Sequence, residues 1–331
     1  MTTKIAVLGG GSWATALVKI LAENPHHQIN WWMRNSRTAA AIRRFHHNPN
    51  YLSDVYIDEE KVKVWLSVHQ AIKEAQYVLI AVPAAFVTDS LAEVTSEDLR
   101  GKKIISAVKG MIPEKHYLVT DLLQKEKGVD VANIGIVGGP CHAEEVALER
   151  QSYLTVASEN FTLAEDFAKM LACRYIKAHP IKDMYGVEYS AVMKNIIALA
   201  SGICHGLGYG DNFQAVLVTN SLKEIQNFLD SIFPQKRNLT ETAYLGDLLV
   251  TAYSQFSRNR TFGSMIGRGY SVKSAQMEMK MVAEGYYAAK SIYAIGQKHQ
   301  VQMPIAQAVY RILYEKASAQ KEINKLKESF Y

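Results

Sequence analysis

The chain has 331 residues, 48% of them hydrophobic, and a formal net charge of +5. This length allows two domains with a sizeable core. The basic residues are dispersed, which argues against a nucleic-acid-binding stripe, and the longest apolar run, residues 77–87, is too short to span a bilayer.

Cysteine and histidine usage predicts neither a disulfide framework nor a metal site. The three cysteines, Cys141, Cys173 and Cys204, are far apart and odd in number, as in a cytoplasmic protein with reduced thiols. The first predicted strand begins at residue 4, which leaves no room for a signal peptide. The two adjacent histidine pairs, His26-His27 and His46-His47, have no accompanying carboxylate–cysteine set, so we expect them at the surface and not as metal ligands.

Residues 4–22 combine an apolar run, a glycine turn and a helical pattern. The run contains β-branched residues, as a buried parallel strand does, and the turn reads Gly9-x-Gly11-x-x-Ala14. In a dinucleotide-binding corner, Gly9 permits the tight turn, Gly11 leaves room for the pyrophosphate and Ala14 lets the helix pack closely. The pattern therefore predicts a dinucleotide site. The alternative is a plain strand-to-helix turn that binds nothing.

The second predicted strand, residues 28–33, ends in Arg34-Asn35-Ser36-Arg37. An acidic residue at this point would accept hydrogen bonds from the adenosine ribose and repel a 2′-phosphate, whereas Arg34 and Arg37 could clamp that phosphate. We therefore predict NADP(H) as the cofactor, in preference to NAD(H). The alternative is that both arginines only solvate the end of the strand.

The remaining pattern predicts a sheet followed by helices. Further strands are expected at residues 61–66, 77–83, 103–108, 134–137, 153–157 and 175–178. Long helices are expected at residues 185–207, 213–233, 242–253, 272–297 and 305–318, and the lysine- and glutamate-rich stretch 319–331 as a solvated helix end or tail. The fold class is thus α/β: a doubly wound Rossmann-type sheet domain, residues 1–184, then an all-helical C-terminal domain, residues 185–331.

Lys194 is the first candidate for chemistry. It lies in a helical stretch in which the next Asp, Glu, Lys or Arg is Asp211, and burial there would lower its pKa toward the range useful for proton transfer. Asn195 follows it, and four of the nine residues 202–210 are glycine, which predicts close approach of the backbone to another element or a ligand. The alternative is a lysine that reaches the surface from a half-buried helix.

Two later stretches are further candidates. One is Leu245-Gly246-Asp247-Leu248. The other, residues 257–263, reads Ser-Arg-Asn-Arg-Thr-Phe-Gly and combines two guanidiniums, an amide and two hydroxyls, which could hold a phosphate dianion. Alone, this second stretch could equally be a capped helix end with exposed arginines.

Taken together, the order of these motifs resembles the bacterial type of NAD(P)-dependent glycerol-3-phosphate dehydrogenase. The resemblance runs from about residue 4 to about residue 303, nearly the whole chain. After the glycine turn, the motifs that carry it are Val108-Lys109-Gly110, Gly139-Pro140-x-x-Ala143-x-Glu145, Lys194-Asn195, Gly246-Asp247-Leu248, Ser257-Arg258-Asn259 and Val282-Ala283-Glu284-Gly285-Tyr286.

The resemblance implies a set of binding residues. Those expected to contact the dinucleotide are Gly9, Gly11, Ser12, Trp13, Arg34, Lys109, Ala143, Arg258, Val282 and Glu284. Those expected to line the substrate pocket are Lys109, Gly139, Cys141, Lys194, Asp247, Ser257, Arg258 and Asn259.

The resemblance also implies a mechanism. NADPH would deliver hydride to the ketone carbon of dihydroxyacetone phosphate while Lys194 protonates the oxygen, and neutral Lys194 would remove that proton in reverse. Lys109 would polarise the carbonyl and favour the neutral form of Lys194, and Asp247 would orient Lys194 and compensate the positive charge. Arg258 and Asn259 would fix the phosphate. The product would supply the backbone of phospholipids.

Two positions depart from the family pattern. Cys141 stands where Ser or Thr is usual, and because a thiol is a weak donor, a backbone contact is expected there rather than a side-chain contact. Val108 replaces a more usual Thr before the lysine.

Other functions remain open at this point. Dehydrogenases of the same architecture act on β-hydroxyacids or ketopantoate, and a non-catalytic NADPH-binding sensor would have an inert Lys194. The expected partner is a small-molecule substrate, with no nucleic acid and no membrane span, and the expected assembly is a homodimer.

Overall fold

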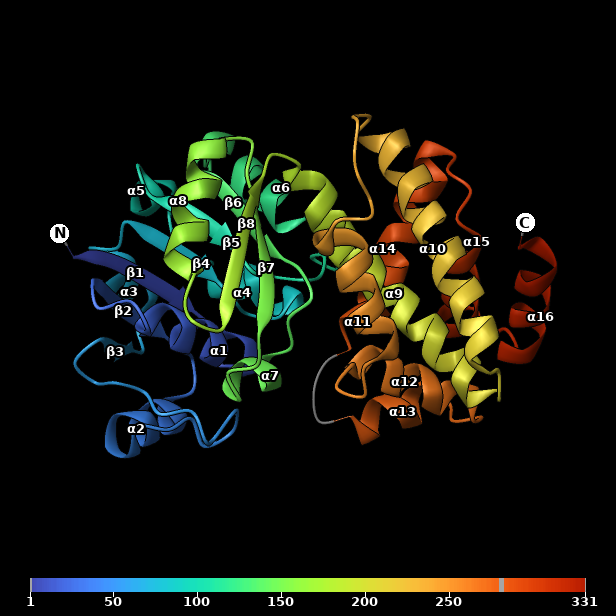
Figure 1. Ribbon diagram of the computed structural model, residues 1–331, viewed down its shortest axis with the longest axis horizontal. Helices are drawn as coiled ribbons and strands as arrows, with labels where there is room; N and C mark the ends of the chain where they lie inside the picture. Colours follow the sequence, from blue (N-terminus) through green and yellow to red (C-terminus); the bar gives the residue numbers. More distant parts are fainter. Residues whose placement is uncertain (1, 280–282, 331) are drawn as a thin grey trace. The chain divides into compact units, whose positions relative to one another are not determined.

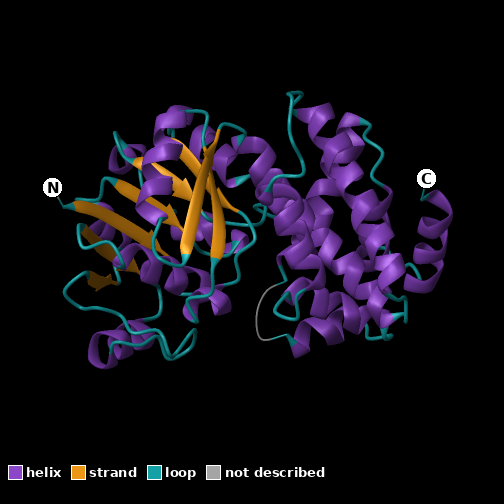
Figure 2. Ribbon diagram, in the orientation of Figure 1, coloured by secondary structure: helices purple, strands orange, loops and turns teal. Residues whose placement is uncertain are grey.

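The computed structural model describes residues 2–279 and 283–330, which divide into two compact units. Residues 1–108 and 119–184 form the first unit, and residues 109–118 and 185–331 form the second. All eight strands lie in the first unit, and the second is built of helices (Figure 2). The segment 109–118, which carries Lys109, thus belongs to the helical unit.

The first unit is a doubly wound sheet, as the sequence predicts. Its strands are β1 (Thr3–Leu8), β2 (His27–Trp32), β3 (Val62–Trp65), β4 (Tyr77–Ile80), β5 (Lys103–Ser106), β6 (Ile134–Gly138), β7 (Ser152–Ala157) and β8 (Ile176–Ile181). Their order is β3-β2-β1-β4-β5-β6-β7-β8, and every neighbouring pair is parallel except β6 with β7. The order reverses beside β1, the point at which open α/β sheets bind ligands at the carboxyl ends of their strands.

Helices cover both faces of this sheet. Ile5 and Val7 belong to one buried cluster with residues of α1 and α8, while Ala6 and Leu8, whose side chains point to the opposite face, are fully buried as well. The helices of this unit are α1 (Ser12–Ala22), α2 (Ser36–Phe45), α3 (Val68–Ile72), α4 (Val87–Ser90), α5 (Ser96–Leu99), α6 (Val119–Lys125), α7 (Ala143–Ala147) and α8 (Phe161–Leu171), with two 3₁₀ turns, η1 (Ala84–Phe86) and η2 (Val131–Asn133) (Figure 1).

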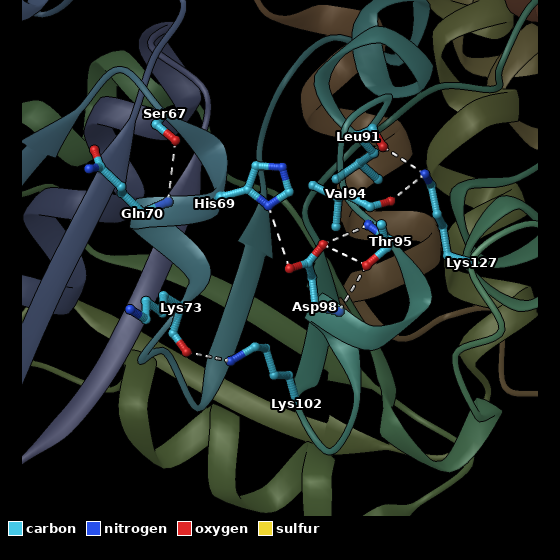
Figure 3. A network of polar contacts seen from close by, with 10 residues as sticks. All are labelled: Ser67, His69, Gln70, Lys73, Leu91, Val94, Thr95, Asp98, Lys102 and Lys127. Carbon is cyan, nitrogen blue, oxygen red and sulfur yellow. Dashed lines mark hydrogen bonds and ion pairs between the residues drawn. The ribbon is translucent and has the colours of Figure 1, made fainter.

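Polar contacts hold the connection between β4 and β5 in place (Figure 3). Thr95 caps α5: its hydroxyl accepts from the Asp98 N–H at 3.2 Å, and the Asp98 carboxylate accepts from the Thr95 N–H at 2.8 Å. His69 lies 3.5 Å from the same carboxylate, and the Lys127 ammonium donates to two main-chain carbonyls before α5 at 2.6 and 2.7 Å. These bonds satisfy the ends of very short helices, which have few intrahelical bonds of their own.

The second unit is all-helical, as predicted. Its helices are α9 (Met184–Gly206), α10 (Asp211–Ile232), the π-helix η3 (Thr242–Gly246), α11 (Asp247–Tyr253), α12 (Arg258–Gly267), α13 (Val272–Glu278), α14 (Glu284–His299), α15 (Pro304–Tyr314) and α16 (Ala319–Ser329). No helix in the described ranges is long and apolar enough to cross a membrane.

Two helix predictions were wrong. The single helix predicted for residues 272–297 is broken: Met279 after α13 and Ala283 before α14 have extended backbones, with ψ of 116° and 101°. The stretch 319–331, predicted as a solvated helix end or tail, does form a helix, but α16 is not fully solvated, because it buries Ile323 and Leu326 on one face while its lysines face outward. The helical pattern in the first stretch and the lysine and glutamate content in the second do not show the tertiary partners that set the break and the burial.

Backbone-to-backbone packing joins α9 to α12. Added Cβ atoms would lie 2.1 Å from the Arg260 carbonyl oxygen at Gly202 and 2.2 Å from the Leu199 carbonyl oxygen at Gly263. Gly206 and Gly267 face each other one turn further on, with each prospective Cβ 2.9 Å from the other residue's Cα. Gly202 and Gly206 of the glycine-rich stretch therefore serve close approach of one helix to another, one of the two roles that the sequence left open.

We predict that Gly263→Ala destabilises the helical unit. The added methyl group forces α9 and α12 apart, and such overpacking costs roughly 1–3 kcal/mol. Chemical denaturation should show this loss, whereas Gly210→Ala, at a position where no described atom lies within 4 Å of the added Cβ, should change the unfolding free energy by less than ~0.5 kcal/mol. Equal stability of the two variants would contradict the packing argument.

Candidate functional site

The glycine turn after β1 has the geometry of a dinucleotide corner. Gly9 has φ of +133°, and a Cβ there would lie 2.6 Å from the Ala81 carbonyl oxygen, so no other residue fits. At Gly11 no described atom lies within 4 Å of the prospective Cβ, which leaves open space beside the backbone. The sequence assigned these two glycines the same two tasks.

Side chains from distant segments brace this turn. Trp31 Nε1 donates to the Gly9 carbonyl at 2.5 Å, and Asn48 Nδ2 donates to the Gly10 carbonyl at 3.1 Å and to the Thr15 hydroxyl at 2.9 Å. Asn48 is fully buried. Neither support is predictable from the sequence, since neither spacing nor residue type connects Trp31 or Asn48 with the turn.

Helix α1 starts directly at the turn. Gly11 is its N-cap, with φ of −84° and ψ of −178°, and no side chain caps the first turn. The main-chain N–H groups of Ser12 and Trp13 therefore stand at the positive end of an 11-residue helix, where an anion is stabilised. Open space at Gly11 together with this helix start fits a pyrophosphate.

Arg34 follows β2 at the same edge of the sheet. Its guanidinium lies over the Phe86 ring, 5.6 Å from the ring centroid, and Phe86 belongs to the turn after β4. Because β2, β1 and β4 are parallel, these carboxyl ends lie along one edge. Arg37 lies in the first turn of α2, which Asn35 caps by accepting from the Thr38 N–H at 3.0 Å. Arg34 and Arg37 are both exposed, and they follow β2 at the sheet edge that also carries the glycine turn after β1.

Gly139, Cys141 and Ala143 follow β6, also parallel to its neighbour β5. Gly139 has φ of +105°, and a Cβ there would lie 2.9 Å from the Tyr153 carbonyl oxygen, so this turn also requires glycine. Cys141 and Ala143 are each 7% exposed and belong to the core cluster. The backbone contact expected at residue 141 stays a prediction.

Lys194 and Asp247 form a buried ion pair in the helical unit. Lys194 on α9 is 4% exposed and donates from Nζ to Oδ1 of Asp247, which is 1% exposed and begins α11 directly after the π-helix η3. Burial lowers the pKa of Lys194 to about 8, with the nearby Asp247 opposing this shift and Lys109 adding to it. Lys194 is therefore not a surface lysine, and its pKa moves in the direction that the sequence predicts.

Lys109 completes this cluster. Its Nζ lies 4.0 Å from Oδ2 of Asp247, an oxygen with no hydrogen-bond partner among the described residues. The Lys109 main-chain oxygen accepts from Asn195 Nδ2 at 2.6 Å. Two cations thus face one buried carboxylate, and the remaining positive charge favours an anionic ligand nearby.

The stretch 257–263 begins a helix that the sequence had left undecided. Ser257 is 4% exposed and caps α12 by accepting from the Arg260 N–H at 3.3 Å. Arg258 is the first residue of α12 and is exposed. Asn259 is buried, donates to Asn195 Oδ1 at 2.9 Å and accepts from the Gly285 N–H at 2.9 Å.

Within the helical unit, the structure thus brings Lys109, Lys194, Asp247 and Asn259 into one set of contacts. Val282 lies outside the described residues, and Glu284 is the first residue of α14. Asn195, which the sequence marks only as the neighbour of Lys194, joins α9 to Lys109 and to α12.

Comparison with known proteins identifies the family. Models of the N-terminus and the C-terminus of NAD-dependent glycerol-3-phosphate dehydrogenase match residues 4–164 and 183–324. The chain belongs to this family. It is 32% identical to glycerol-3-phosphate dehydrogenase [NAD(P)+] of Staphylococcus epidermidis over 98% of each chain, and 34% identical to that of Streptococcus sanguinis over 97% of this chain and 94% of the relative.

Solved structures agree with this assignment. The crystal structure of glycerol-3-phosphate dehydrogenase from Coxiella burnetii matches with a TM-score of 0.90 and 30% identity over 99% of both chains. A D-mandelate dehydrogenase and a ketopantoate reductase from Ralstonia eutropha match with TM-scores of 0.61 and 0.59 at 15% and 12% identity, which shows a shared fold alone. The ketopantoate rival thus shares the architecture, whereas both halves of the chain match the glycerol-3-phosphate dehydrogenase family.

We predict that Arg34→Ala weakens binding of NADPH by roughly 10- to 100-fold, because a charge-assisted hydrogen bond is worth about 1.5–3 kcal/mol. NADH binding should change by less than about threefold, since it lacks the 2′-phosphate. Fluorescence titration of the bound dinucleotide measures both constants. Arg44→Ala is the matched control, because Arg44 also lies over a phenylalanine ring, at 5.1 Å. Equal losses for NADPH and NADH would show that Arg34 does not read the 2′-phosphate.

Proposed function

We propose that this protein catalyses the reversible reduction of dihydroxyacetone phosphate to sn-glycerol 3-phosphate with NAD(P)H, with Lys194 as the general acid and base. The observation that carries this proposal is the buried Lys194–Asp247 pair with the Lys109 ammonium 4.0 Å from the second Asp247 oxygen. A lysine with a pKa of about 8 can both give and take a proton near neutral pH. The glycerol phosphate formed would serve glycerophospholipid synthesis.

In this mechanism the helical unit moves the proton. When bound, the nicotinamide supplies the hydride that reaches the ketone carbon. The Lys194 ammonium gives its proton to the oxygen that becomes the secondary hydroxyl, and the Asp247 carboxylate keeps that ammonium oriented and charged until transfer. Lys109 polarises the carbonyl and lowers the cost of neutral Lys194 after transfer.

The start of α12 is the proposed phosphate site. Arg258 supplies the charge, and the helix start that Ser257 caps adds a positive dipole end. Asn259 uses its amide oxygen and one N–H in contacts with α14 and α9, and its second N–H is assigned to the phosphate. In the first unit, Gly139 and Cys141 would contribute main-chain contacts to the substrate, and Ala143 would lie near the nicotinamide.

The remaining proposals concern cofactor choice, assembly and location. The absence of an acidic residue in the sequence after β2 and the exposed Arg34 and Arg37 support a preference for NADPH over NADH. A homodimer is supported by the exposed apolar side chains Leu249, Tyr253 and Phe256 of the helical unit. A cytoplasmic location is proposed as the compartment in which such thiols stay reduced.

We predict that Lys194→Met folds and binds NADPH but loses kcat by at least about 100-fold, the scale of general acid–base catalysis. The pH dependence of kcat in the wild type should have opposite directions for reduction and oxidation if Lys194 is the acid and base. Reduction needs the ammonium form, so its kcat should fall as the pH rises through about 8, whereas oxidation of glycerol 3-phosphate needs the amine and should rise to a plateau above about 8.

The absorbance of NADPH measures these rates, as its loss during reduction of dihydroxyacetone phosphate and as its formation during oxidation of glycerol 3-phosphate. Lys223→Met, at an exposed position on α10, is the control. Near-normal turnover of Lys194→Met would remove Lys194 from the mechanism. A wild type that binds NADPH but does not turn over dihydroxyacetone phosphate would point first to a hydroxyacid substrate and, without turnover there, to a sensor.

We predict that Arg258→Ala lowers kcat/KM for dihydroxyacetone phosphate by roughly 10- to 100-fold, the value of about 1.5–3 kcal/mol for bonds between charged groups. Reduction of unphosphorylated dihydroxyacetone should change by less than about threefold, because it has no phosphate to lose. Arg268→Ala, at the opposite end of α12, is the matched control. If both substrates lose the same factor, the phosphate lies elsewhere.

A further inference from the structure

The Lys109 main chain is held by a chain of amide hydrogen bonds that begins on α14. The Gly285 N–H donates to Asn259 Oδ1 at 2.9 Å, Asn259 Nδ2 donates to Asn195 Oδ1 at 2.9 Å, and Asn195 Nδ2 donates to the Lys109 carbonyl at 2.6 Å. The four side-chain atoms between these two ends belong to Asn259 and Asn195, which are 7% and 5% exposed. In such surroundings each bond matters, because an unsatisfied amide costs free energy.

This chain has a fixed polarity. The Gly285 N–H can only donate, so the oxygen of Asn259 must face it and the nitrogen of Asn259 must face Asn195. The Lys109 carbonyl can only accept, so the nitrogen of Asn195 must face it, and the two ends agree on the same orientation of both amides. Asn195 Nδ2 also donates to the Ala191 carbonyl at 3.1 Å, so both of its hydrogens are used within the protein.

One turn of α9 therefore positions both lysines: it carries Lys194 itself, and its Asn195 holds Lys109. Lys194 reaches Oδ1 of Asp247 directly, and Asn195 holds the main chain of Lys109, whose ammonium lies 4.0 Å from the other oxygen of Asp247. Since neighbouring residues on a helix keep a fixed relation, the distance between the two cations depends on the Asn195 contact.

Two further contacts support α14 as the anchor. A Cβ at Gly285 would lie 2.5 Å from the Asn195 carbonyl oxygen, so the start of α14 lies directly against α9. Further along α14, the fully buried Ser291 hydroxyl lies 3.0 Å from His116 Nδ1, and His116 has a positive φ of 54° that a non-glycine residue adopts only with support. The segment 109–118 is thus fastened directly to α14 at His116, and to α9 at Lys109.

We propose that Asn195 and Asn259 are positioning residues: their hydrogen-bond chain from Gly285 fixes the main chain of Lys109 and so sets where its ammonium stands relative to Lys194 and Asp247. The proposal rests on the proposed roles of both lysines. It differs from phosphate binding, because Asn195 has no amide hydrogen left for a ligand while this arrangement holds.

The test uses Asn195→Ala and Asn195→Asp in the full chain. Asp has the size of Asn and still accepts from Asn259, but it cannot donate to the Lys109 carbonyl. Hydrogen exchange measured by mass spectrometry should rise by at least about 10-fold for peptides covering residues 109–118. Asn220→Ala is the matched control, since Asn220 Nδ2 also donates to a main-chain carbonyl, that of Val216 at 2.9 Å.

Kinetics provide the second readout. Misplacement of a reacting group by about 1 Å can cost about 100-fold, so kcat should fall by roughly 10- to 100-fold in both variants, with KM for dihydroxyacetone phosphate within about threefold. Unphosphorylated dihydroxyacetone should lose the same factor, unlike in Arg258→Ala. In Asn195→Ala the kinetic pKa assigned to Lys194 should rise, because the Lys109 cation moves away.

The outcomes separate the hypotheses. Unchanged exchange at residues 109–118 in both variants, or kcat within about twofold of the wild type, overturns the positioning role. A loss in the Asn195 variants that is confined to KM and to the phosphorylated substrate would make Asn195 a phosphate ligand instead. The double variant Asn195→Ala, Asn259→Ala should show hydrogen exchange at residues 109–118 that is little faster than in Asn195→Ala alone, because the hydrogen-bond chain is already broken. Exchange decides the proposal even if Lys194→Met retains turnover and the proposed mechanism fails.

Discussion

Burial of a single amine, that of Lys194, is the constraint on which the helical unit depends. An ammonium inside an apolar helix is costly unless an opposite charge lies close by, and Asp247 supplies it from the start of α11. A π-helix leads directly into that aspartate, as often occurs where a side chain has to be aimed at a site. The pair leaves the second Asp247 oxygen for the Lys109 ammonium, so the positions and charges of Lys194, Asp247 and Lys109 depend on one another.

Such a cluster requires helices that cannot shift past one another. Glycines meet this requirement around α9: Gly202 and Gly263 bring the backbones of α9 and α12 into contact, and Gly285 does the same for α14. Larger side chains between these helices could adopt several rotamers and would let the helices shift, whereas direct contact of the backbones fixes the position of one helix along the other. Asn195 and Asn259 can bond each other because this packing brings α9 and α12 so close.

How far the sequence alone leads depends on how local each feature is. The corner of Gly9 and Gly11 is contiguous with its strand and helix, so turn, strand and open backbone could all be predicted from one stretch. Lys194 was found because a charge in an apolar helix stands out by itself, and burial explains the direction of its pKa. Its partner lies 53 residues away, and only the family resemblance named it.

The same reasoning explains what was missed within one motif. Ser257, Arg258 and Asn259 are contiguous and were given one task, yet the helix start separates them: the first caps α12, the second is exposed, and the third is buried between α9 and α14. Side-chain chemistry is the same in a ligand and in a support; what differs is which hydrogens the protein already uses. That accounting needs partners 64 and 86 residues apart in the chain, and it identifies Asn195, whose two amide hydrogens both bond to main-chain carbonyls, as a support.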